Sequence, residues 1–117
     1  MESNLHLLLQ NVFGLEDFRP VQKQVIDSVM EGKDTLALLP TGGGKSLCYQ
    51  VPGLAKEGIC LVISPLIALM KDQVDALNKN KIISAFINST LEWIEIEKIL
   101  NDIAFGKIKM LYVAPER

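Results

Sequence analysis

The residues best suited to chemistry form one short run in the first half of the chain, Thr41-Gly42-Gly43-Gly44-Lys45-Ser46. Polyphosphate carries concentrated negative charge, which backbone N–H groups at the positive end of a helix can bind. The three glycines would let the backbone curve around a β-phosphate. Lys45 would reach the β and γ oxygens as the candidate catalytic group, and the Ser46 hydroxyl would complete a magnesium shell. The run therefore predicts a site for ATP and Mg²⁺.

The strict phosphate-loop pattern asks for a glycine five positions before Gly44, and Leu39 stands there instead. The surrounding pattern supports the site nevertheless, because an apolar run at 35–39 predicts a strand before the loop and the residues from Lys45 onward predict a helix after it. The alternative is a glycine-rich turn with a solvated lysine.

Helical and extended patterns alternate along the whole chain. Apolar stripes predict helices over 5–12, from Pro20 to Gly32, from Lys45 onward, after Ser64, and from Ser89 to Gly106. Apolar runs predict strands at 35–39, 59–63, 82–87 and 108–113. Strands that are apolar on both faces and are separated by helices indicate a mostly parallel sheet covered on both sides. The expected fold is a three-layer α/β domain.

Two helix starts and one aromatic residue carry more specific expectations. Ser64 is expected to cap a helix that begins at Pro65, and Ser89 with Glu92 forms a capping-box pattern. Trp93 shares a helical stripe with Ile96 and Leu100, which favours a packed anchor over a surface that stacks on a base. Lone His6 has no partner pattern for catalysis or for a metal.

Bulk composition narrows the possible functions. A chain of 117 residues that is 49% apolar is expected to form one domain. With 12 basic and 14 acidic side chains and a net charge of −2, any contact with nucleic acid must be local. Cys48 and Cys60 match neither a metal motif nor a disulfide framework, and no membrane span or secretory signal is visible, so an intracellular protein is expected.

Five segments in a fixed order connect the chain to a known family. They are FGLEDFRPVQ at 13–22, LLPTGGGKSLCYQVP at 38–52, LVISPLIALMKDQVDAL at 61–77, INST at 87–90 and LYVAPER at 111–117. Together they resemble RecQ-type DNA helicases over nearly the whole chain. The resemblance implies a RecA-like fold of the P-loop NTPase class, with residues 1–117 as the N-terminal part of the first motor domain. It also implies an ATP- and Mg²⁺-dependent enzyme that moves 3′ to 5′ on DNA, with roles in repair and recombination.

The resemblance also assigns roles to individual residues. Arg19 and Gln22 would recognise the adenine, with the glutamine amide on the base edge, the arginine over its face, and Leu15 supplying apolar contact where the family often has an aromatic residue. From the residues alone, Arg19 reads as a solvated charge and Gln22 as a surface amide. Contacts to DNA, as a single strand or tailed duplex, would come from five polar residues: Ser64, Lys71, Gln73, Asn88 and Ser89.

Hydrolysis needs an acidic pair for the metal and a positive group for the transition state. In the family both lie after the position of Arg117, so we interpret the chain as truncated and expect it to bind nucleotide weakly and to lack DNA-stimulated ATPase activity on its own. The alternative is a non-enzymatic nucleotide-binding or interaction module; a small kinase is disfavoured because no acceptor-binding segment is recognisable. An uncovered last strand is expected to favour self-association. In a bacterium the expected location is the cytoplasm, with the nucleoid.

Overall fold

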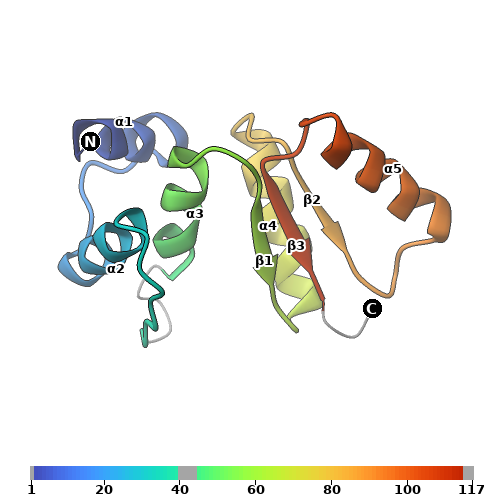
Figure 1. Ribbon diagram of the computed structural model, residues 1–117, viewed down its shortest axis with the longest axis horizontal. Helices are drawn as coiled ribbons and strands as arrows, with labels where there is room; N and C mark the ends of the chain where they lie inside the picture. The colour runs from blue at the N-terminus through green and yellow to red at the C-terminus, as the bar shows by residue number, and fades with distance from the viewer. Residues whose placement is uncertain (1, 40–44, 115–117) are drawn as a thin grey trace. The chain divides into compact units, whose positions relative to one another are not determined.

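The computed structural model describes residues 2–39 and 45–114, and the chain divides into two compact units, Met1–Glu57 and Gly58–Arg117. The first unit consists of helices and the second contains the sheet (Figure 1). Within the described residues, no helix combines the length and the apolar content that crossing a membrane requires.

The first unit is built from three helices, α1 (Glu2–Phe13), α2 (Pro20–Met30) and α3 (Lys45–Ala55). Helix α3 packs against both α1 and α2. One buried residue from each helix forms the centre of this packing: Leu5, Ile26 and Val51. Pro20 opens α2 as predicted, because its fixed φ suits the first helical position and its missing N–H leaves no bond unmade there. This unit therefore holds the start of α3 in a fixed place.

The strand predicted at 35–39 is wrong for the described structure. These residues form no regular element, and Leu36 and Leu38 are 89% and 87% exposed. The segment is tied only near its start, where the Thr35 and Ser28 hydroxyls lie 2.8 Å apart. A strand exists only where a neighbour satisfies its N–H and C=O groups, and among the described residues no strand pairing includes 35–39.

The second unit is a small parallel sheet with two helices. Strands β1 (Cys60–Ile63), β2 (Ser84–Ile87) and β3 (Met110–Val113) alternate with α4 (Ile67–Lys79) and α5 (Trp93–Ala104). The strand order is β1-β3-β2, so the last strand lies in the middle and pairs in parallel with both others. Parallel neighbours need long crossover connections, which the helices supply. The predicted α/β class is confirmed (Figure 1).

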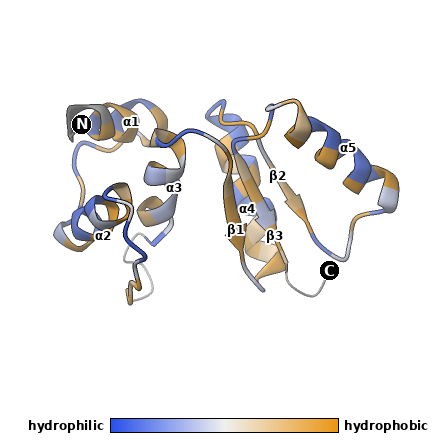
Figure 2. Ribbon diagram, in the orientation of Figure 1, coloured by the Kyte–Doolittle hydropathy of each residue, from blue (hydrophilic) through white to orange (hydrophobic). Residues whose placement is uncertain are grey.

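The strands differ in how far they are buried. In the central strand β3, Met110, Leu111 and Tyr112 are all buried, as the prediction of strands covered on both faces requires. In the edge strand β1, by contrast, Leu61 and Ile63 are exposed, although its sequence is apolar throughout (Figure 2). Exposed residues alternate with half-buried ones along β1, so this strand is exposed on one face, and the same apolar composition gives different burial.

Both predicted helix starts lie too early. Helix α4 begins at Ile67, and the Ser64 hydroxyl instead accepts the Leu66 N–H at 3.1 Å, in a turn that precedes the helix. Helix α5 begins at Trp93, where the Glu92 N–H donates to Glu95 Oε1 at 3.1 Å, so the capping pair is shifted by three residues. Short polar side chains form such local turns in competition with helix caps.

The expectation that Trp93 is a packed anchor is also wrong, because its side chain is 66% exposed. Side chains on a helix lean toward its N-terminus. Since Trp93 is the first residue of α5, its indole extends past the end of the helix rather than over a turn of it. Ile96, one turn further on, is buried as predicted.

Candidate nucleotide and nucleic-acid sites

The N-terminus of α3 carries the two described residues of the predicted phosphate loop. Lys45 is its first residue and is exposed, and Ser46 follows and is half-buried. Thr41, Gly42, Gly43 and Gly44 lie outside the described residues. The first N–H groups of a helix have no acceptor within it, and its dipole places positive charge at the same end. Lys45 adds an ammonium group, so this helix end can bind an anion such as a phosphate.

Buried residues further along α3 hold this end in position. Cys48 and Val51 face the other helices, and Lys56, just after α3, donates from Nζ to the Val29 carbonyl oxygen in the last turn of α2 at 2.8 Å. Burial raises the pKa of the Cys48 thiol. Burial also raises that of Cys60, against a smaller opposing effect of nearby Lys109. Both thiols are therefore poor nucleophiles and poor metal ligands.

Ser46 is the one metal ligand that the sequence predicted. Among residues 2–39 and 45–114, no group of three His, Cys, Asp or Glu side chains is arranged to hold a metal ion. Mg²⁺ does not need such a cage, because it commonly keeps several waters and takes one or two protein oxygens together with substrate phosphates. A single hydroxyl in the first turn of α3, beside an anion-binding helix end, fits that mode of binding.

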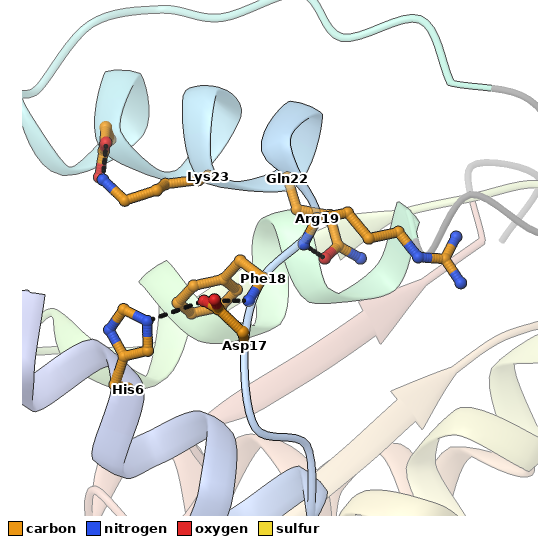
Figure 3. Close-up of polar contacts among 7 residues, drawn as sticks. His6, Asp17, Phe18, Arg19, Gln22 and Lys23 are labelled. Atoms are coloured by element: carbon orange, nitrogen blue, oxygen red, sulfur yellow. Dashed lines mark hydrogen bonds and ion pairs between the residues drawn. The ribbon is translucent and has the colours of Figure 1, made fainter.

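The residues predicted to recognise the base lie where the loop after α1 enters α2. Gln22 is only 3% exposed, and its Oε1 accepts the Arg19 N–H at 2.8 Å (Figure 3). Gln22 is therefore not the surface amide that the residues alone suggested. Arg19 is exposed and extends away from the contacts that the neighbouring loop makes with α1 (Figure 3). Leu15 is also exposed.

The loop before Arg19 contains contacts that the sequence did not predict. His6 Nε2 on α1 lies 3.0 Å from Asp17 Oδ1, and the same oxygen accepts the Phe18 N–H at 2.8 Å (Figure 3). The His6 and Phe18 rings meet edge to face with their centroids 5.3 Å apart. The His6 hydrogen bond, then the Phe18 hydrogen bond, lowers the pKa of Asp17. No spacing rule links a helix residue with a loop residue eleven positions later, so only the fold reveals this contact.

Three of the predicted DNA contacts are close to one edge of the sheet. Ser64 follows β1, and Asn88 and Ser89 follow β2. The Ser64 N–H donates to the Val113 carbonyl oxygen at 3.0 Å, so the ends of β1 and β3 are level there. Ser64 and Asn88 thus flank the central strand at the carboxyl ends, roughly two strand spacings or about 10 Å apart. Ligands of open parallel sheets bind at this edge.

These three side chains differ in availability. Asn88 is 2% exposed, and its Oδ1 accepts from both the N–H and the hydroxyl of Thr90, so it shapes the turn. Ser64 holds the turn before α4, whereas Ser89 is exposed and does not cap α5. Ser89 is therefore the side chain of the three that is best placed to meet a ligand.

The other two predicted DNA contacts are on α4 and do not share a face. Lys71 is exposed and pairs with Asp75 at 3.2 Å, as its i,i+4 spacing predicts, whereas Gln73 is half-buried. Residues two positions apart project from nearly opposite sides of a helix. The structure therefore does not bring Lys71 and Gln73 together.

Comparisons with known proteins show which family and which relatives this chain resembles. A family model described as DEAD/DEAH box helicase matches residues 19–117. The ATP-dependent DNA helicase RecQ of Pasteurella multocida (strain Pm70) is 50% identical over 110 residues, which cover 94% of this chain and 17% of that protein. The protein of the same name from Bacillus subtilis (strain 168) is 51% identical over 111 residues, covering 94% of this chain and 19% of that protein.

A more distant relative gives the same result. The ATP-dependent DNA helicase Q1 of Pongo abelii is 41% identical over 115 residues, again 94% of this chain and 17% of the relative. The chain therefore spans less than a fifth of the length of these curated relatives.

Proposed function

Because this chain belongs to the DEAD/DEAH box helicase family, we propose that it forms the nucleotide-gripping part of the first, RecA-like motor domain of a RecQ-type, ATP-dependent DNA helicase. The parent protein would use ATP and Mg²⁺ to move 3′ to 5′ along DNA, with a single strand or a tailed duplex as substrate. Because its substrate would be DNA, the parent protein would act at the chromosome, which in a bacterium lies in the nucleoid.

The observation that carries the proposal is the pairing of two features in the first unit. Lys45 and Ser46 open a helix that packs against α1 and α2, and Gln22 is fixed at the start of α2. A phosphate-binding helix end and a preorganised amide are the two kinds of contact that a nucleotide needs, one for its charge and one for its base.

In the proposed mechanism, Lys45 donates hydrogen bonds to the β- and γ-phosphate oxygens and balances their negative charge. Negative charge builds up on the oxygen between these two phosphates as the γ-phosphoryl group leaves, and Lys45 would stabilise that charge as well. Ser46 would supply one oxygen to Mg²⁺, which neutralises charge between the same two phosphates when bound. Gln22 would orient the base, with Arg19 over its face and Leu15 against it. These residues bind and position ATP and do not themselves activate water.

Coupling to DNA would start at the carboxyl edge of the sheet. Ser89 is proposed to donate to a backbone phosphate, while Ser64 and Asn88 hold the loops that present this edge. Lys71 would add a local positive charge, and Gln73 would position α4. The chain's net charge of −2 requires such contacts to be local.

The test is displacement of a fluorescent ATP analogue from the chain and from the intact protein that contains it. Lys45→Ala is expected to weaken ATP binding by about a hundredfold, because charge-assisted hydrogen bonds to phosphate are lost. Lys98→Ala removes the same charge from an exposed position on α5 and should leave binding unchanged. Equal affinity of both variants for ATP would reject the proposed site.

Turnover provides a second reading. The 117-residue chain alone should show no DNA-stimulated ATPase activity, since the proposed site residues bind and position ATP but do not activate water. The intact protein should hydrolyse ATP when single-stranded DNA is added. Robust ATP hydrolysis by the isolated chain would contradict the proposal that its residues bind ATP but do not activate water.

A further inference from the structure

The contact between α1 and the loop over residues 14–19 fixes the chain just before the proposed base-binding residues. His6 projects from α1 to Asp17, and Asp17 also holds the Phe18 N–H, so one carboxylate joins a helix side chain to the loop backbone (Figure 3). The edge-to-face contact between the His6 and Phe18 rings adds a second attachment at the same point. Phe18 also packs against the core of the first unit.

The consequence reaches Arg19 and Gln22 through the backbone. Arg19 follows Phe18 directly and forms the N-cap of α2, and its N–H donates to Gln22 Oε1. A displacement of Asp17 and Phe18 would move the Arg19 N–H and so remove the bond that orients the Gln22 amide. His6 therefore acts on Gln22 through two residues without touching it.

The charges around His6 make this contact sensitive to pH. Asp17 faces it from the loop, while Lys23 and Asp27 of α2 line the same small cavity and pair with each other at 3.1 Å. Asp17 is a carboxylate that the imidazole contacts directly. Histidine changes charge between about pH 5 and pH 8, so an uncharged hydrogen bond becomes an ion pair as the pH falls through this range.

We propose that His6 is a positioning residue for base recognition, which holds the segment 17–22 through Asp17 and thereby sets the affinity for the adenine part of ATP. The inference rests on the proposed role of Arg19 and Gln22 and goes beyond it by adding a control outside the binding residues. Protonated His6 favours the binding geometry, and neutral His6 holds it less firmly.

The test compares ATP with tripolyphosphate, which has the phosphates but no base. Their affinity ratio for the intact protein would be measured by calorimetry at pH 6 and pH 8, in the wild type and in three variants. His6→Gln keeps an amide N–H near the position of Nε2 but does not titrate, His6→Leu removes the hydrogen bond, and Asp17→Asn removes the charge at an exposed position.

In the wild type, the ATP preference should be about threefold greater at pH 6 than at pH 8, the scale of one partly exposed ion pair. His6→Gln should keep a preference that no longer changes with pH, and His6→Leu should lose about threefold at pH 6. Asp17→Asn should also flatten the pH profile. At each pH, tripolyphosphate affinity should be the same in the wild type and in the variants, which also checks that each variant is folded.

Two results would overturn the inference by itself: an ATP preference that is the same in His6→Leu as in the wild type, or a pH dependence that persists in His6→Gln. A wild type that binds ATP no better than tripolyphosphate would overturn the proposed role of Arg19 and Gln22 as well. The two failures are therefore distinguishable.

Discussion

Gln22 is hydrogen-bonded to Arg19, the N-cap residue of its own helix. Gln22 Oε1 accepts the Arg19 N–H at 2.8 Å, and the side chain is almost wholly buried. This is the arrangement in which an N3 glutamine satisfies the N-cap N–H of a helix. Capping α2 uses one lone pair of that oxygen. The proposed contact with a base would be a second role of the same side chain.

Two substitutions test the two roles of Gln22. Gln22→Glu keeps the capping oxygen but removes the N–H donors, so ATP binding should weaken at least about tenfold, and the buried carboxylate should also lower the free energy of unfolding. Gln22→Ala loses both and should also lower the free energy of unfolding by about 1 to 2 kcal/mol. Urea denaturation and ATP titration measure the two effects. If Gln22→Glu bound ATP as tightly as the wild type, the proposed role of Gln22 in base recognition would be rejected and only its capping role would remain.

The start of α5 should depend for its stability on Glu95 and not on Ser89, which the sequence pattern had suggested as the cap. Glu95→Ala removes the acceptor of the Glu92 N–H and should destabilise the chain by about 1 kcal/mol, whereas Glu95→Gln keeps an oxygen and should not. Ser89→Ala should leave stability within about 0.5 kcal/mol, because Ser89 does not cap α5. It should nevertheless weaken binding of single-stranded DNA, measured by fluorescence anisotropy. A stability loss in Ser89→Ala equal to that in Glu95→Ala would contradict the observed start of α5.

Lys81 occupies a backbone conformation that suits glycine. Its φ is 67°, and the bonds Lys81 N–H to Asn78 oxygen and Ile82 N–H to Leu77 oxygen close the end of α4. Glycine stands at the matching position after α5, where Gly106 has a φ of 71°. Lys81→Gly should therefore raise the free energy of unfolding by about 0.5 to 1 kcal/mol.

A matched control for Lys81 is Lys79→Gly, in the last turn of α4, which should instead lower stability by about 0.5 to 1 kcal/mol. Both variants lose one exposed lysine, so charge is balanced between them. Urea denaturation with unchanged slopes would make the comparison valid. A destabilised Lys81→Gly would contradict the conformation seen at this position.

Asp17 should contribute to stability in a pH-dependent way. Its hydrogen bond from His6, then that from Phe18, lowers its folded-state pKa below the ordinary 3.8. The contribution is therefore fully present above 3.8 and is lost as the pH falls from there through the lowered value. Asp17→Asn cannot titrate, so the free energy of unfolding of the wild type should fall more steeply with acid than that of the variant. If the free energy of unfolding fell equally steeply in the wild type and in Asp17→Asn between pH 5 and pH 2, the lowered pKa of Asp17 would be contradicted.

The sequence by itself determined the order and type of most elements, because helical stripes and apolar runs of fixed period report which face of each element is buried. Helices α2 and α3 and all three paired strands appear where those patterns indicated, with bounds shifted by a few residues. The sequence also singled out Lys45, Ser46 and the family, since glycine, lysine and serine in that order have a specific use on phosphate.

Only the tertiary structure decided which apolar residues are covered. Leu36 and Trp93 are large apolar residues of the kind found in a core, yet both are exposed. Burial requires a neighbouring element and a side chain that points toward it, and a local sequence pattern specifies neither. The same reason hides the contact of His6 with Asp17, which exists because α1 and the following loop fold back on each other. The local periodicity of the sequence specifies the helices and strands. The packing of the chain decides which residues distant in sequence come together to form a site.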